Sequence, residues 1–253
     1  MKIDLNSDMG ESYGIYTMGN DAELMNYVKS INIACGFHAG DPVIMENTVK
    51  MAKEKGVAIG AHPSFPDLPG FGRRYMNCTA QEIKNYILYQ VGALKSFADM
   101  YDVKLQHVKP HGALYNMAMD DENIAIPVVE AIATLGEDLI TFGFDNSEVQ
   151  YQCQKKGIRY AVEGYADRQH TDNGRIIMTR TGAQSQTTEE LADRAVRLIM
   201  EKKVISTTGN DIDMPVMTVC MHGDTPDVVK LAELITMKLI ANDVEICKIS
   251  DFI

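Results

Sequence analysis

Short apolar segments alternate with amphipathic, helix-like segments along the whole chain. Eight of the short segments are rich in apolar or β-branched residues and are expected to form strands: residues 2–8, 30–35, 57–62, 105–110, 139–144, 158–163, 216–221 and 245–250. Strands that alternate with helices build parallel sheets. Seven or eight such units in 253 residues favour one closed (β/α) barrel domain over residues 1–253. No G-x-G-x-x-G motif follows the first segment, which disfavours a dinucleotide-binding sheet.

Residues that favour helix ends mark where the helices are expected to start and stop. A side chain that can cap the first turn stands before proline, or three residues before glutamate, at four places: Asp41-Pro42, Thr79 with Glu82, Thr187 with Glu190, and Thr225-Pro226. The helix that starts at Pro42 is expected to end at residue 55, because Gly56 suits the left-handed position after a helix.

Composition and charge exclude several classes of function. The chain has 24 basic and 35 acidic residues and a net charge of −11, which disfavours nucleic acid as a partner because such binding neutralises phosphates. No signal peptide is expected, and no apolar stretch approaches the roughly 18 residues of a membrane-spanning helix. The five cysteines include no C-x-x-C pair, and Cys35 and Cys220 are expected to be small buried hydrophobes rather than nucleophiles. These features predict a cytoplasmic protein without a membrane segment.

Four of the six histidines stand where a short apolar segment passes into glycine-rich, polar sequence: His38, His62, His111 and His222. In a (β/α) barrel the loops after the strands share one rim, so side chains far apart in the sequence converge there. The pattern therefore predicts one active site at this rim. The polar, turn-rich segment 164–186 is expected to form a functional loop or small hairpin over it.

The first predicted strand and the histidines after it supply candidate metal ligands. Asn6 and Asp8 share one strand face, because side chains alternate with a period of two, and Glu11 follows just beyond. A carboxylate and two histidines from three successive strand ends, Asp8 with His38 and His62, suit a divalent-metal site with open positions for water. The alternative is that the acidic segment is a hydrogen-bonded turn and that each histidine bonds only to a neighbouring loop.

Lys109 and His111 share one face of the predicted strand 105–110. An inward lysine beside a histidine can polarise a carbonyl oxygen or pair with an anion, and neighbouring positive charge is expected to lower its pKa. The alternative for Lys109 is an apolar stem along the rim with its ammonium group in water. His107 lies on the same face but deeper, and is expected to be structural.

Further charged residues follow two other predicted strands. The segment Gly70-Phe-Gly-Arg73-Arg74 offers two guanidinium groups suited to bidentate contacts with a carboxylate or phosphate, although an arginine pair is also commonly a solvated surface charge. An acid pair and a guanidinium group accompany the segment 158–163: Glu163, Asp167 and Arg168. No Walker motif occurs in the chain, so no nucleotide site is visible.

Seven motifs in combination resemble one known family. They are Asp4-Leu-Asn-Ser-Asp-Met-Gly-Glu11, Asn32-Ile-Ala-Cys-Gly-Phe-His-Ala-Gly-Asp-Pro42, Gly60-Ala-His-Pro-Ser-Phe-Pro-Asp67, Gly70-Phe-Gly-Arg-Arg74, Val108-Lys-Pro-His-Gly-Ala-Leu-Tyr-Asn116, Ala166-Asp-Arg168 and His222-Gly-Asp-Thr-Pro226. Over essentially its whole length the chain is similar to the LamB/YcsF family, the A subunits of bacterial ATP-dependent 5-oxoprolinases. The resemblance implies a (β/α) barrel like that of the glycoside hydrolase/deacetylase superfamily, and partner subunits B and C. It also implies that the lactam of 5-oxo-L-proline is opened to L-glutamate as ATP, bound with Mg²⁺, is hydrolysed to ADP and phosphate.

On this resemblance the rim residues take hypothetical roles. A lactam is a resonance-stabilised amide, and phosphorylation of its carbonyl oxygen creates a good leaving group. Arg73 or Arg74 would hold the substrate carboxylate or the transferred phosphoryl group, while Lys109 would stabilise the developing oxyanion. Water would be activated, directly or through a metal ion, by one of Asp8, His38, His62 and His111. The other candidates are assigned to substrate binding: Asn6, Glu11, Glu163, Asp167, Arg168 and His222.

The chain departs from the family pattern in one region, residues 163–186. The family tends to have a larger apolar residue at Gly164, a tyrosine at His170 and a Pro-Arg pair at Thr179-Arg180. These departures bear on fine substrate specificity.

Two other functions remain open at this point. A stand-alone metal-dependent deacetylase acting on an acetylated sugar would use the same fold, with an aspartate and two histidines, but would need neither ATP nor partners. A binding module that presents substrate or regulates a partner is disfavoured by the many ionisable groups at one rim. Dependence on ATP distinguishes the first alternative from the 5-oxoprolinase.

Overall fold

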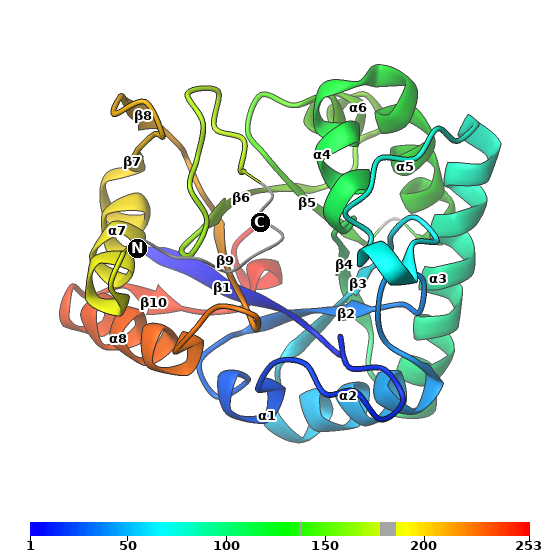
Figure 1. Ribbon diagram of the computed structural model, residues 1–253, viewed down its shortest axis with the longest axis horizontal. Coiled ribbons are helices and arrows are strands. Elements are labelled where there is room, and N and C mark those ends of the chain that lie inside the picture. Colours follow the sequence, from blue (N-terminus) through cyan, green and yellow to red (C-terminus); the bar gives the residue numbers. More distant parts are fainter. Residues whose placement is uncertain (137, 178–185) are drawn as a thin grey trace.

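The computed structural model describes residues 1–136, 138–177 and 186–253, and these residues form a closed barrel of seven parallel strands (Figure 1). The barrel strands are β1 (Lys2–Met9), β2 (Ser30–Ala34), β3 (Ala58–His62), β4 (Leu105–Val108), β5 (Ile140–Gly143), β6 (Tyr160–Tyr165) and β9 (Thr218–His222). They pair in this order, and β1 closes the ring by pairing with both β2 and β9. The predicted (β/α) barrel is confirmed.

Helices surround the barrel (Figure 1). They are α1 (Asp21–Leu24), α2 (Pro42–Lys55), α3 (Ala80–Met100), α4 (Gly112–Asp120), α5 (Glu122–Leu135), α6 (Glu148–Lys156), α7 (Thr188–Glu201) and α8 (Val228–Ala241), with short 3₁₀ turns η1 (Leu68–Gly70) and η2 (Ile249–Asp251). Apolar faces of these helices pack with outward-facing strand residues such as Ile3 and Leu5 in one large hydrophobic cluster. None of the described helices is long and apolar enough to cross a bilayer.

Three of the four predicted helix starts are confirmed. The carboxylate of Asp41 accepts hydrogen bonds from the first turn of α2, and capping boxes at Thr79 and Thr187 begin α3 and α7. Helix α2 ends at Lys55 before Gly56, which has a left-handed φ of 67°. The predicted start at Thr225-Pro226 is wrong. Helix α8 begins at Val228, and the Thr225 hydroxyl is instead bonded to the buried Asp167.

The last predicted strand does not become a full barrel strand. Its first two residues form β10 (Glu245–Ile246), which pairs with the start of β1, and the chain then turns into η2. Ile249 of η2 packs against Ile140 and Phe142, so the C-terminal segment closes the bottom of the barrel. Between β6 and β9 lies an antiparallel hairpin that was not predicted, β7 (Lys203–Ile205) with β8 (Asp211–Asp213).

The barrel interior is strongly polar along β1. Asn6 donates hydrogen bonds to Glu163 Oε1 (3.1 Å) and to Thr218 Oγ1 (2.7 Å), and Thr218 donates to Asp4. All of these side chains are fully buried, so each needs a partner inside the protein. The result is a column of hydrogen-bonded side chains that leads along the strand to Asp8 at the rim.

The predicted loop over the rim is partly described. Residues 164 and 165 still belong to β6, and residues 166–177 form a loop with one antiparallel bridge between His170 and Ile176. Residues 178–185, with Thr179-Arg180, lie outside the described residues.

The close packing of Gly60 on β3 against His107 leads to a testable prediction about stability. Its Cα faces the ring of His107, which stacks on Phe142, and a Cβ atom at residue 60 would lie 2.1 Å from His107 Nε2. We expect Gly60→Ala to lower the free energy of unfolding by about 1–3 kcal/mol, the usual cost of overpacking, as measured by urea denaturation.

Gly92→Ala on α3 is the matched control. A Cβ atom there meets nothing within 4 Å, and replacing a glycine inside a helix stabilises by about 0.5–1 kcal/mol. Equal unfolding free energies for the two variants would show that His107 does not constrain residue 60.

Candidate active site

A pocket lies at the carboxyl ends of the barrel strands, where the sequence predicts the active site. It is lined by Asp8, His62, Arg73, Lys109, Pro110, His111, Gly112, Tyr115, Asn116, Tyr165, Arg168, Ile176, Ile177 and His222. Side chains from β1, β3, β6 and β9 therefore meet here although they are far apart in the sequence. Ile176 and Ile177 come from segment 164–186, so the described part of that segment does reach over the rim.

The ammonium group of Lys109 lies between two carboxylates at the floor of the pocket. Its Nζ atom is 2.8 Å from Glu163 Oε1 and 3.2 Å from Asp8 Oδ1, and only 2% of the side chain is exposed. The Tyr165 ring lies 5.1 Å from the same nitrogen. The alternative of a stem with its ammonium group in water is therefore wrong.

The charge state of Lys109 also differs from the prediction. Burial alone lowers the pKa of Lys109, but the carboxylates of Asp8 and Glu163 outweigh burial and raise that pKa well above its ordinary value. The prediction that neighbouring positive charge lowers the pKa of Lys109 is therefore wrong. A permanently protonated lysine suits the stabilisation of a developing oxyanion and does not suit the role of a base.

Asn6 and Glu163 lie beneath the pocket and do not line it. Glu163 is fully buried, and its Oε2 atom accepts hydrogen bonds from the hydroxyls of Tyr115 (3.0 Å) and Tyr165 (2.8 Å). Asn6 donates to its other oxygen, which also pairs with Lys109. The structure thus places these two predicted substrate-binding residues where they position Lys109.

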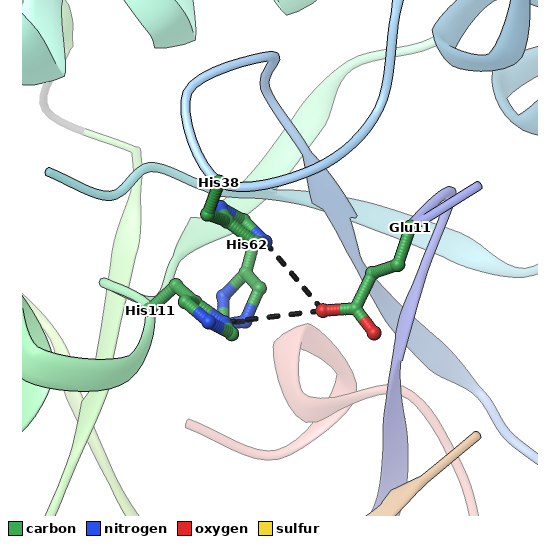
Figure 2. Close-up of side chains that lie close together, drawn as sticks. All are labelled: Glu11, His38, His62 and His111. Atoms are coloured by element: carbon green, nitrogen blue, oxygen red, sulfur yellow. Dashed lines mark hydrogen bonds and ion pairs between the residues drawn. The ribbon is translucent and has the colours of Figure 1, made fainter. Parts of the chain in front are cut away.

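Three histidines and Glu11 gather beside the pocket (Figure 2). One ligand atom from each of Glu11, His38, His62 and His111 lies within 4.8 Å of all the others. Imidazole nitrogens and a carboxylate oxygen are donors for divalent transition metals. Of the predicted metal ligands, His38 and His62 lie in this group. Asp8 lies in a neighbouring group with Cys220 and His222, although its Oδ2 atom is also 3.2 Å from His62 Nε2.

Two backbone carbonyls orient His62 and His111. His62 Nδ1 lies 2.7 Å from the carbonyl oxygen of Lys109, and His111 Nε2 lies 2.9 Å from that of Phe71. A carbonyl oxygen only accepts hydrogen bonds, so both of these nitrogens carry the proton. The other two nitrogens, His62 Nε2 and His111 Nδ1, face one another at 2.9 Å.

Burial governs the protonation of this group. It lowers the pKa of His38 and of His111 well below the ordinary value, and neighbouring histidines lower both further. Burial also raises the pKa of Glu11 well above its ordinary value, as does the charge of Asp8. Asp8 itself has a pKa well below its ordinary value, because His62 and Lys109 outweigh its own burial.

Asp167 fixes the orientation of His222. The Asp167 carboxylate accepts hydrogen bonds from the ring Nδ1 of His222 (3.0 Å) and from its backbone N–H (2.9 Å). His222 Nε2 then faces the pocket, 3.6 Å from Asp8 Oδ2. Burial raises the pKa of Asp167, but His222 and Arg168 outweigh it and lower that pKa well below its ordinary value. This arrangement is typical of an aspartate that holds a general acid–base histidine.

The structure separates the two neighbouring arginines. Arg73 lines the pocket, with 16% of its side chain exposed, and lies 3.3 Å from Asp224. Arg74 turns away and pairs with Asp67, with 54% of its side chain exposed. Of the pair, only Arg73 can contact a ligand in this pocket. Arg168 also lines the pocket and pairs with the same carboxylate, that of Asp224 (2.6 Å).

The two cysteines at the strand ends are buried and protonated. Burial raises the pKa of Cys35 to about 12 and that of Cys220 well above its ordinary value. This agrees with the prediction that neither is a nucleophile.

Several residues at the site were not singled out from the sequence. Asn32 donates hydrogen bonds to Asn6 (2.7 Å) and Asp8 (2.8 Å), and Asp224 joins the two arginines of the pocket. Strand alternation could have identified Asn32, since it interrupts an apolar segment. Nothing in the sequence indicates which arginine Asp224 would pair with.

Packing explains one departure from the family pattern. A Cβ atom at Gly164 would lie 2.6 Å from Val216 Cγ1 and 2.9 Å from Leu198 Cδ2, so α7 packs too closely here for a larger side chain. His170 bonds through Nδ1 to Arg194 (2.7 Å) and lies outside the pocket lining.

Comparisons with known proteins agree with this fold and show the family. The sequence profile of the LamB/YcsF family matches residues 3–253. The chain is 47% identical to the 5-oxoprolinase A subunit of Campylobacter jejuni subsp. doylei over 253 residues (100% of this chain, 99% of the relative), and 45% identical to that of Pyrococcus horikoshii over 254 residues (100% of both). A crystal structure of "Lactam Utilization Protein" from Thermus thermophilus has a TM-score of 0.90 at 37% identity, covering 98% of this chain and 99% of that chain. The chain therefore belongs to the LamB/YcsF family.

Proposed function

We propose that this chain is one of the subunits of an ATP-dependent 5-oxoprolinase and that its rim pocket binds 5-oxo-L-proline. The names of the relatives support a role in hydrolysis of a cyclic amide within a complex of several subunits. The observation that carries the proposal is the pocket itself. Its lining combines the buried ammonium group of Lys109, the guanidinium groups of Arg73 and Arg168, and His222, which suit an anionic amide.

The substrate has two features that such a pocket can recognise. Its carboxylate suits the guanidinium of Arg73 or Arg168, and its lactam oxygen suits the ammonium of Lys109. Negative charge grows on the oxygen atoms bonded to the lactam carbon when water attacks that carbon. A preformed cation in a dry pocket stabilises that charge at little reorganisation cost.

His222 is the best placed group to move a proton. Its Nδ1–H is held by Asp167, so the lone pair of Nε2 faces the pocket and can accept a proton from water. In this proposal His222, rather than the sequence candidates His38, His62 and His111, acts as the base. His38 does not line the pocket, and the ring nitrogens His62 Nε2 and His111 Nδ1 face one another at 2.9 Å.

We propose that ATP acts in the assembled complex with subunits B and C, in the cytoplasm, where ATP is abundant. ATP would transfer a phosphoryl group to the lactam oxygen, which makes the carbonyl carbon more electrophilic. Water would then add to that carbon, the C–N bond would break with the nitrogen taking up a proton, and a second water would hydrolyse the resulting acyl phosphate to glutamate and phosphate. Arg73 and Lys109 suit a phosphoryl group in the pocket, but the chain has no Walker motif to hold the rest of the nucleotide with its Mg²⁺.

The function is tested by measuring glutamate release from 5-oxoproline by the chain alone, by the chain with subunits B and C, and by the full mixture without ATP. We expect glutamate only from the complete mixture with ATP. Acetate release from an acetylated sugar by the chain alone, together with an inactive full mixture, would favour the metal-dependent deacetylase.

The two neighbouring arginines form a matched pair for a second prediction. Arg73→Gln removes a charge from the pocket wall, so we expect kcat/KM of the complex for 5-oxoproline to fall by about 10- to 100-fold, the value of one charge-assisted hydrogen bond. Arg74→Gln removes an exposed charge paired with Asp67 and should leave kcat/KM nearly unchanged. Equal losses in both variants would refute the assignment of Arg73 to the substrate.

The Asp–His pair gives a third prediction. Asp167→Asn would hold His222 in the wrong tautomer, so we expect kcat to fall by about 10²- to 10⁴-fold, with little further loss in the double variant Asp167→Asn/His222→Gln. Steady-state kinetics of the complex with both single variants and the double variant test this non-additivity. Additive losses would show that the two residues act independently.

A further inference from the structure

We propose that Glu11, His38, His62 and His111 form a binding site for one divalent transition-metal ion. The proposed lactam-opening chemistry does not require this site. The four residues come from four different places at the rim, namely the segment after β1, the loop after β2, the end of β3 and the start of α4 (Figure 2).

Three separations between the ligand atoms are close to those of a metal coordination shell. Metal–ligand bonds of about 2.0–2.1 Å in a tetrahedron place the ligand atoms roughly 3.3 Å apart. Here His62 Nε2 and His111 Nδ1 are 2.9 Å apart. Glu11 Oε1 is 3.5 Å from His38 Nε2 and 3.9 Å from His111 Nδ1. These separations lie on both sides of the tetrahedral value.

Polar atoms in this group are buried without a hydrogen-bond partner. Glu11 Oε1 and both ring nitrogens of His38 have no such partner among the residues that the structure describes. An unsatisfied buried polar atom costs free energy, so it marks a place where a ligand belongs. A cation between Glu11 and His38 would satisfy two of these three atoms.

The tautomers of His62 and His111 provide a second observation that is independent of burial. The backbone carbonyls orient both rings so that His62 Nε2 and His111 Nδ1 lie 2.9 Å apart, with Asp8 Oδ2 3.2 Å from His62 Nε2. Two ring nitrogens this close need a cation between or beside them, either a proton or a metal ion. Histidines that bind metals commonly donate their other N–H to a backbone carbonyl, as both of these do.

The neighbouring group of possible ligands is a poorer choice for a metal ion. Asp8, Cys220 and His222 also approach one another, but the ammonium of Lys109 lies 3.2 Å from both Asp8 Oδ1 and Cys220 Sγ. Its positive charge repels a second cation there. The positive charge of Arg73 also acts on His38 and Glu11, but the Glu11 side chain there offers a carboxylate to a cation.

The donor set selects the class of metal. Three imidazole nitrogens and one carboxylate oxygen suit ions such as Zn²⁺, Co²⁺, Fe²⁺ or Ni²⁺. Mg²⁺ and Ca²⁺ prefer oxygen ligands and several waters, which this group does not offer. His62 and His111 also line the pocket, so the bound ion would lie beside its wall.

Direct metal binding by the full-length chain tests the site. The protein is stripped with a chelator, titrated with Zn²⁺ by calorimetry, and loaded with Co²⁺ for visible spectroscopy. We expect one ion per chain and the intense absorption of four-coordinate Co²⁺. His38→Gln and Glu11→Gln should each weaken Zn²⁺ binding by at least about 100-fold, because each removes a ligand.

His170→Gln is the matched control. His170 is also a buried histidine with an unpartnered Nε2 atom, but no carboxylate of the described residues pairs with it. Its substitution should leave Zn²⁺ affinity unchanged. Circular dichroism checks the fold of each variant, and Glu11→Gln decides the test if His38→Gln does not fold.

Two results would overturn the proposal. One is the absence of stoichiometric Zn²⁺ or Co²⁺ binding by the wild-type chain, and the other is wild-type affinity in folded Glu11→Gln. Because no readout here involves 5-oxoproline or ATP, failure of the metal site and failure of the proposed function can be told apart.

Discussion

The buried ammonium of Lys109 is the charge on which the organisation of the barrel depends. A lone buried cation would cost many kcal/mol, so the fold must place compensating charge and hydrogen bonds around it. Asp8 and Glu163 provide the charge, while Asn6 and Asn32 hold the two carboxylates in place. The buried ammonium group therefore requires the column of polar side chains inside the barrel. The hydrophobic core lies outside the strands instead.

Local patterns in the sequence predict much of this architecture. Seven of the eight predicted strand segments form the barrel. They could be predicted because the alternation of short apolar segments with amphipathic helical segments is a local property of the sequence. The caps at Asp41, Thr79 and Thr187 were predictable for the same reason, since a cap depends on residues only three apart. The convergence of the histidines followed from topology, because parallel strands bring their carboxyl ends to one rim.

The remaining features depend on contacts between distant segments, which no local pattern encodes. Thr225 looked like a helix cap, but its hydroxyl is bonded to Asp167, 58 residues earlier in the chain. The pKa of Lys109 was predicted in the wrong direction, because the sequence shows adjacent histidines but not the carboxylates that fold against it. Likewise, the sequence does not distinguish Arg73 from Arg74. In the structure, after the turn at η1, Arg73 points into the pocket and Arg74 into solvent.

The carboxylate of Asp8 contacts groups on both sides of it at the rim. Asp8 directs Oδ1 toward Lys109 and Oδ2 toward His62 and His222, so a single side chain lies between the pocket, the histidine cluster and the Asp167–His222 pair. On the two proposals above, a ligand that draws Asp8 toward one neighbour would withdraw charge from the others. The pocket and the metal site would then be thermodynamically coupled through Asp8, and by reciprocity each ligand would change the affinity for the other by the same factor.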